Sequence, residues 1–211
     1  MGEVKEKYTL NYFLGSNELG HKMNYGADGR EEFFKGDVYP KMKRLLSISK
    51  IDKESIVLDV GCGRGDALRW CLQKESKRVT GIDFSSAAIL ISRITLGNWL
   101  TEENRVNLVC TEIEDYLPND KFNRVLLFDV LEHVPQDELE IFFLRLVDSV
   151  LPGCLFIWWT PNFWDKDKLY KSDKHPKTSG MHCNKFTWER VTSFLSGFNL
   201  KPTDNKFVWR K

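Results

Sequence analysis

Three alternating glycines, Gly61, Gly63 and Gly65, are the residues of this chain whose spacing most clearly suggests chemistry. They follow the apolar run Val57–Val60, which contains one acid, Asp59, and has the composition of a buried parallel strand. A helical pattern begins directly after them. Glycine takes positive φ and lets a ligand approach where a Cβ would collide, and N–H groups at a helix start are free to face it. The spacing predicts a nucleotide-binding turn between a strand and a helix.

A second acidic residue follows about one strand–helix–strand unit later. Residues 78–82 form another short strand-like run, and Asp83 ends it. An acidic side chain in this place can accept hydrogen bonds from both hydroxyls of a ribose. A glycine turn alone is weak evidence for a nucleotide, so this second strand and its acid are what favour a ribose-bearing ligand.

With these two motifs the chain resembles the class I S-adenosylmethionine-dependent methyltransferases, especially their small-molecule branch with an L-D-V-G-C-G-x-G motif. The further matching stretches occur in the family's order and are Ile82–Ser85, Cys110–Asp115, Phe128–Val134, Leu151–Gly153 and Thr160–Asn162. The resemblance covers residues 50 to 200, approximately. It implies a doubly wound, mostly parallel seven-stranded α/β sheet with an antiparallel C-terminal strand, and S-adenosylmethionine as the cofactor.

The resemblance also implies a set of cofactor-binding residues. They are Asp59, Gly61, Cys62, Gly63, Gly65, Asp83, Phe84, Glu112, Ile113 and Asp129. Asp59 would bind the methionine amino group, and Asp83 would bind the ribose hydroxyls. Structural alternatives are a helix-capping role for Asp59 and an N-cap role for Asp83.

The adenine contacts are the less specific part of this assignment. Phe84 and Ile113 would sandwich the ring, and Glu112 would accept a hydrogen bond from the N6 amine. The family more often has Asp at the position of Glu112, and Glu114 and Asp115 compete for the same role.

Methyl transfer requires alignment of the acceptor with the sulfonium, and a general base is needed only where the acceptor must lose a proton. His133, just past the fourth strand, resembles a family position that faces the methyl donor, and a packing role is the alternative. His182 is similar to a histidine at the substrate entrance, with loop anchoring as its alternative. Asp129 is a cofactor or substrate contact rather than a base. The sequence favours no metal site.

Alternating strand and helix patterns predict a single methyltransferase domain over 1–211, with a lid-like segment at 1–40 and a catalytic core at 41–211. Expected strands are 55–60, 77–82, 105–110, 123–129 and 154–159. Expected helices are 38–49, 66–75, 86–97, 136–150 and 187–195, with Ser85 or Ser86 as the N-cap of the third. Residues 198–203 and 206–209 are expected to form a closing hairpin.

Residues 1–35 and the loop 161–183 would cover the site when ligands bind. Aromatic residues that would line an acceptor pocket, about half of them also core, are Tyr8, Tyr12, Phe13, Tyr25, Phe33, Phe34, Trp158, Trp159, Phe163, Trp164 and Tyr170.

Composition and charge limit the classes of partner that the protein is expected to bind. The 211 residues include 31 basic and 30 acidic side chains, a formal net charge of +1, so no overall field attracts nucleic acid or anionic lipid. No run is long enough to span a bilayer, and the N-terminus lacks a signal-peptide core. The odd, scattered cysteines are typical of reduced core residues in a cytoplasmic protein. A monomer and a homodimer are both compatible with the sequence.

These observations predict transfer of a methyl group from S-adenosylmethionine to an oxygen or nitrogen of a small-molecule acceptor. An RNA-directed methyltransferase is the alternative enzyme. The tetrapeptide Asn/Asp-Pro-Pro-aromatic, which nucleic-acid amino-methyltransferases carry after the fourth strand, is absent here. A nicotinamide-dependent oxidoreductase would share the glycine turn, but Asp59 would repel a dinucleotide phosphate. A non-catalytic cofactor-binding subunit is a third reading.

Overall fold

A mostly parallel β-sheet organises the computed structural model, which describes residues 6, 8–14, 35–38, 40–160, 188–202 and 208–210. Its parallel strands are β1 (Ile56–Val60), β2 (Arg78–Asp83), β3 (Val106–Cys110), β4 (Phe122–Phe128) and β5 (Val150–Trp159). Two short strands, β6 (Lys201–Pro202) and β7 (Val208–Arg210), complete the order β3-β2-β1-β4-β5-β7-β6. β7 pairs antiparallel to β5, which confirms the predicted doubly wound α/β sheet with an antiparallel C-terminal strand.

The helices that flank the sheet begin and end close to their sequence signals. They are α2 (Leu10–Leu14), α4 (Pro40–Ser47), α5 (Asp66–Gln73), α6 (Ser86–Leu96), α7 (Leu139–Asp148) and α8 (Trp188–Ser196). Two short 3-10 segments, η1 (Gly97–Thr101) and η2 (Leu131–His133), follow α6 and β4. Ser85 is the N-cap of α6, because its Oγ accepts a hydrogen bond from Ala88 N–H, so the first of the two expected caps is the correct one.

Alternating side chains of the strands build two apolar cores, one on each face of the sheet. Val57 packs with residues of α4, α5 and α6, whereas Leu58, its neighbour in the chain, packs with residues of α7 and α8. The same alternation repeats along β4 and β5, as the period of two in a strand requires. Strands buried on both faces explain why these segments are continuously apolar in the sequence.

Several element boundaries differ from the sequence-based expectation, among them the start of β5 at Val150, and two of the differences have a clear structural reason. The expected strand 198–203 is wrong in its first half, because Asn199 takes φ +59° and the chain closes a Schellman cap of α8. Leu200 N–H donates to the Leu195 carbonyl and Asn199 N–H to that of Ser196. The expected helix 136–150 ends two residues early, since Val150 already pairs with Phe122 as the first residue of β5.

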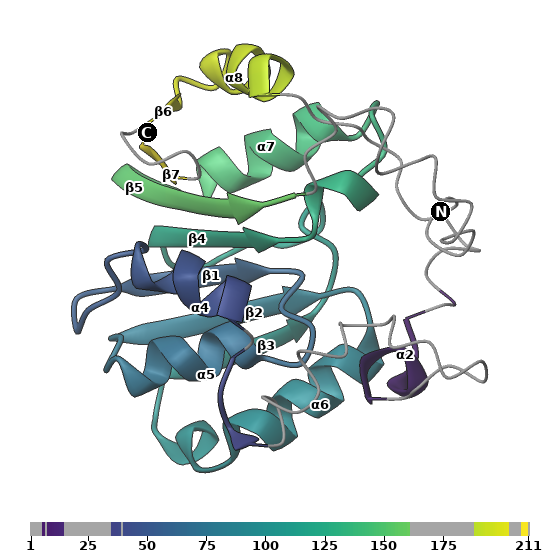
Figure 1. The fold of residues 1–211 in the computed structure, drawn as a ribbon, viewed down its shortest axis with the longest axis vertical. Helices are drawn as coiled ribbons and strands as arrows, with labels where there is room; N and C mark the ends of the chain where they lie inside the picture. The colour runs from purple at the N-terminus through teal and green to yellow at the C-terminus, as the bar shows by residue number, and fades with distance from the viewer. Residues whose placement is uncertain are drawn as a thin grey trace.

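Ligands of doubly wound sheets bind at the carboxyl ends of the strands. The turns after β1, β2, β3 and β4 all reach this edge, and the arrowheads of β4 and β5 in Figure 1 point to the side of the molecule where α2 lies. α2 packs against α6 on this side. The rest of the expected cover, residues 1–5, 7 and 15–34 and the loop 161–183, lies outside the described residues.

Gly81, in the middle of β2, tests how tightly α5 packs on the sheet. A Cβ there would lie 2.5 Å from Leu68 Cδ1 and 2.9 Å from Cys62 Sγ. We expect Gly81→Ala to lower the free energy of unfolding by about 1–3 kcal/mol, the usual cost of overpacking a core. Urea unfolding measures it, with Ile94→Ala as the control, since Ile94 is 71% exposed on α6 and should change stability by about 0.5 kcal/mol or less. Equal stability of the wild type and the Gly81 variant would contradict this packing.

Candidate active site

The glycine turn between β1 and α5 has the positive φ angles that the sequence predicts. Gly61, Gly63 and Gly65 take φ of 68°, 53° and 77°. A Cβ on Gly61 would lie 2.7 Å from Val130 Cγ2, and one on Gly65 would lie 3.0 Å from Ser92 Oγ. Both glycines are therefore required by the packing of the turn against neighbouring segments of the protein, in addition to any ligand.

The N–H groups of this turn are hydrogen-bonded inside the protein. Those of Gly61 and Cys62 both donate to the Ile82 carbonyl, at 2.8 and 3.0 Å. That of Gly63 donates to the carboxylate that ends β2, at 2.9 Å, and that of Gly65 turns back to the Cys62 carbonyl, also at 2.9 Å. These four donors differ from those of a phosphate-cradling turn, which point at the ligand.

Cys62 supports the turn through its side chain. The thiol is buried, lies 3.9 Å from Ser92 Oγ, and has its pKa raised well above the usual value by burial and then by Asp83 and Asp59. Ser92 Oγ in turn donates to the Gly63 carbonyl at 2.8 Å. A thiol in this setting stays protonated and packs like a small apolar side chain.

Asp59 places a carboxyl group at the carboxyl end of β1, with only 3% of the residue exposed. Burial raises its pKa well above the ordinary value, and the nearby carboxylates of Asp83 and Asp66 raise it further. A cation bound beside Asp59 would favour the ionised form that the protein itself disfavours. A positively charged ligand group would therefore be bound favourably beside Asp59.

Asp83 lies at the end of β2, and backbone donors fix both of its oxygens. Oδ2 accepts from Gly63 N–H at 2.9 Å and Oδ1 accepts from Ser85 N–H at 2.8 Å. A carboxylate oxygen has two lone pairs, so each can accept one more hydrogen bond. Burial raises the pKa of Asp83, while these two backbone bonds oppose the rise. Its alternative role as the N-cap of α6 is excluded, because Ser85 fills that position.

The segments after β2 and β3 meet beside Asp83. Thr111 N–H donates to the Asp83 carbonyl at 3.0 Å, and the Cys110 thiol donates to the Phe84 carbonyl at 3.5 Å. Phe84 is 37% exposed, so its ring offers an apolar surface at this edge. Glu112 is half-buried in the adjoining segment.

Ile113, the other expected adenine contact, is turned into the core. It is 4% exposed and packs in the same cluster as Tyr116 and Val134. Glu114, next in the chain, has its pKa raised by burial and then by Glu112 and the acids Glu138 and Asp115.

The segment after β4 gathers three polar side chains. Asp129 is exposed and takes φ 54°, an uncommon angle for this residue type, while its N–H donates to the Trp159 carbonyl at 2.8 Å. Glu132 is buried and accepts a hydrogen bond from Thr160 Oγ1 at 2.9 Å. His133 is half-buried, and its ring centre lies 6.2 Å from that of Tyr8 in an edge-on arrangement.

Most of the expected site residues therefore lie at one edge of the sheet. The exceptions are Ile113, whose side chain is turned into the core, and His182, which lies outside the described residues. The sequence did not single out Glu132, whose only signal is its place beside His133, or Thr160, which reaches it from the end of β5. Of the aromatic residues expected to line a pocket, about half of which were expected to be core, Phe13 and Trp158 are buried core residues.

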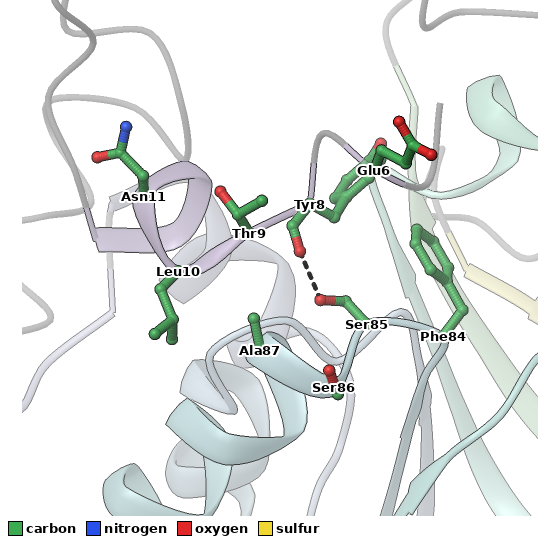
Figure 2. A pocket seen from close by; sticks show the side chains of 9 residues that line it. All are labelled: Glu6, Tyr8, Thr9, Leu10, Asn11, Phe84, Ser85, Ser86 and Ala87. Carbon is green, nitrogen blue, oxygen red and sulfur yellow. Dashed lines mark hydrogen bonds between the residues drawn. The ribbon is translucent and has the colours of Figure 1, made fainter. Parts of the chain in front are cut away.

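A cavity of about 590 Å³ adjoins this edge between α2 and the start of α6 (Figure 2). Its lining is formed by Glu6, Tyr8, Thr9, Leu10, Asn11, Phe84, Ser85, Ser86 and Ala87. The cavity shares Phe84 and Ser85 with the surroundings of Asp83, but none of the residues of the glycine turn lines it. We therefore place the candidate active site by its carboxylates and glycines rather than by this cavity.

Two kinds of feature are absent from the described part of the chain. No group of three or more His, Cys, Asp or Glu side chains there could hold a metal ion. None of the helices there has the length and apolar character needed to cross a membrane.

Residues 57–153 match the family described as a methyltransferase domain. Sphingolipid C9-methyltransferase 1 of Gibberella zeae is 24% identical, over 69% of this chain and 30% of its own length. A ubiquinone biosynthesis O-methyltransferase of Pasteurella multocida is 36% identical, over 37% of this chain and 36% of its own length. The chain thus spans about a third of the length of these curated relatives.

Solved structures are similar in fold. One is the 1,6-didemethyltoxoflavin-N1-methyltransferase of Burkholderia thailandensis, solved with 1,6-didemethyltoxoflavin and S-adenosylhomocysteine. It superposes with a TM-score of 0.64 at 19% identity, over 88% of this chain and 83% of that chain.

The raised pKa of Asp59 predicts a pH dependence of stability. The folded protein holds this proton at pH values where the unfolded chain has released it, so the free energy of unfolding falls as the pH rises from the ordinary carboxyl range toward the raised pKa. Asp66 and Asp83 act in the same direction. We expect Asp59→Asn to reduce this fall without abolishing it, measured by urea unfolding from about pH 4 to about pH 8. Parallel curves for the two proteins would contradict the assignment.

Proposed function

We propose that this chain, which belongs to the class I S-adenosylmethionine-dependent methyltransferases, transfers a methyl group from that cofactor to an oxygen or nitrogen of a small molecule. The observation that carries the proposal is the carboxylate of Asp83, held by Gly63 and Ser85 N–H groups with one acceptor site left on each oxygen. Two hydroxyls on neighbouring carbons of a ribose suit that pair of acceptors.

The other residues of the edge fit the remaining parts of the same cofactor. Asp59 would hold the methionine ammonium, since a cation there relieves the cost of a buried carboxylate. Phe84 would cover one face of the adenine, and Glu112 would accept from its amine. Ile113 would contribute its backbone and the edge of its side chain, because the rest packs in the core.

The turn itself argues against a dinucleotide cofactor. A dinucleotide-binding turn needs N–H groups directed at the pyrophosphate, whereas those of Gly61, Cys62, Gly63 and Gly65 are already used within the protein. Asp59 adds negative charge at the same strand end, where two phosphates would be repelled. An adenosyl ligand with a positive sulfonium meets neither difficulty.

When bound, S-adenosylmethionine supplies a methyl group already activated on a positive sulfur. The protein therefore has to align the acceptor, exclude water and remove a proton where the acceptor carries one. His133 is the proposed base at this edge, with the Asp129 carboxylate as a further contact to cofactor or acceptor. His182, which the sequence predicts at the substrate entrance, remains a second candidate base.

Named relatives support the acceptor class. They include enzymes named for O-methylation in ubiquinone biosynthesis and for N1-methylation of a toxoflavin precursor, both small molecules. A relative named for the C9 position of a sphingolipid makes carbon the third outcome of an acceptor screen. We propose a cytoplasmic enzyme, in keeping with the protonated, buried thiols of Cys62 and Cys71.

Cofactor choice is tested by titrating the protein with S-adenosylmethionine, S-adenosylhomocysteine and NAD in a calorimeter. We expect the two adenosyl ligands to bind and NAD to bind at least tenfold more weakly, a difference of about 1.4 kcal/mol or more. Binding of NAD without binding of either adenosyl ligand would overturn the proposed function.

The ribose contact is tested with Asp83→Ala. Loss of two hydrogen bonds to a charged group should weaken S-adenosylhomocysteine binding by roughly 1.5–3 kcal/mol. Asp137→Ala is the matched control, because Asp137 is exposed and lies outside the site, so its affinity should equal that of the wild type. Circular dichroism establishes that both variants are folded, and unchanged affinity in folded Asp83→Ala would remove Asp83 from the site.

A further inference from the structure

Residues 8–14, which include the short helix α2, are held against α6 by apolar packing and one hydrogen bond. Phe13 is buried and packs with Ala88 and Ile91 of α6. Ser85 Oγ donates to the Tyr8 carbonyl at 2.7 Å, the bond drawn as a dashed line in Figure 2. Tyr8 and Tyr12 also pack against this cluster but are only partly buried, so Phe13 is the main apolar anchor of the segment.

These anchors bring Tyr8 between two segments of the candidate active site. Its ring centre lies 5.0 Å from that of Phe84, which follows β2, and 6.2 Å from that of His133, which follows β4. Both contacts are edge-on, a favoured arrangement of aromatic rings. Tyr12 lies next to Tyr8, with ring centres 4.6 Å apart.

Tyr12 is half-buried, and its contact with Tyr8 brings it toward the segments that follow β2 and β4. Burial raises its pKa to about 12, and the carboxylates of Asp129, Glu132 and Asp83 contribute to the rise, while a hydrogen bond with Tyr8 opposes it. Its hydroxyl therefore stays protonated at every physiological pH. A neutral donor is thus placed among carboxylates that come from the ends of β2 and β4.

We propose that Tyr12 is a cofactor-binding residue of this site, whose hydroxyl hydrogen-bonds to the adenosyl ligand held by Asp83, and that Tyr8 and Ser85 are the positioning residues that keep it there. The inference rests on the proposed function and adds to it a contact from α2, outside the matched residues 57–153. It assigns the face of α2 that carries Tyr12 to the binding surface.

Ser85 links the two sides of this arrangement. Its N–H donates to Asp83, its Oγ accepts from Ala88 N–H as the cap of α6, and the same Oγ donates to Tyr8. The carboxylate proposed to hold the ribose and the segment that carries Tyr12 are therefore attached to one residue. Loss of the Ser85 hydroxyl should loosen Tyr12 without altering the Asp83 side chain.

The test compares S-adenosylhomocysteine affinity by calorimetry in the full chain. We expect Tyr12→Phe, which keeps the ring and loses one hydroxyl, to weaken binding roughly three- to tenfold, the range for one hydrogen bond, with an unchanged melting temperature. Asn11→Ala is the matched control, because Asn11 is exposed on the same helix and its side chain points away from Phe84 in Figure 2. Its affinity should equal that of the wild type.

A second pair of variants, at Ser85, tests its positioning role through the affinity for S-adenosylhomocysteine. Ser85→Ala loses the hydrogen bond to Tyr8 and should weaken binding, whereas Ser85→Thr keeps a hydroxyl that can donate to Tyr8 and cap α6 and should restore it. Equal affinity of wild type, Tyr12→Phe and Ser85→Ala would overturn the inference and leave the proposed function standing. Absence of any adenosyl-ligand binding by the wild type would overturn the proposed function, and this inference with it.

Discussion

Two backbone N–H groups that converge on the Asp83 carboxylate hold the candidate active site together. One comes from Gly63 in the turn after β1, and the other from Ser85 at the start of α6. The pair joins two strands and a helix through a single side chain, and charge-assisted bonds of this kind are stronger than those between neutral groups. The positions of the glycine turn, of Phe84 and of α2 all depend on this junction.

Glycine is required at Gly61 and Gly65 by the packing of the turn, and close approach of a ligand would require glycine there as well. Gly61 and Gly65 need positive φ, and a side chain on either would collide with Val130 or Ser92 of the protein itself. The turn thus lies deep between the end of β4 and α6, with its donors satisfied internally. Such a turn gives up its ability to cradle phosphate and gains a fixed shape against which a ligand can be held.

The sequence predicted those parts of the fold and site that local rules determine. Continuous apolar runs located the parallel strands, and Ser85 and the glycines located the helix starts. It could not predict that Asn199 would close a Schellman cap where apolar alternation suggested a strand, because that alternation reflects burial of Phe198 and Leu200 against α7 and α8.

Side-chain orientation was equally beyond the sequence. Ile113 follows an acid-rich stretch that matched an adenine-binding motif, yet packing with Tyr116 and Val134 turns it inward. The aromatic residues near the N-terminus could not be sorted from composition alone. Phe13 is buried against α6, whereas Tyr8 and Tyr12 are only partly buried there, and the Tyr8 ring contacts Phe84 and His133 at the edge where β2 and β4 end.

The electrostatics of the edge follow from its burial. Asp59, Asp66 and Asp83 all have raised pKa values with burial as the largest cause, although Arg64 and Arg69 pair with Asp66 and oppose its rise. Carboxylates in such positions cost stability in the unliganded protein, which a fold tolerates where a ligand gains from them. A ligand carrying an ammonium and a sulfonium favours the ionised carboxylates. The same burial that weakens the free protein would therefore strengthen its selectivity for a cationic methyl donor.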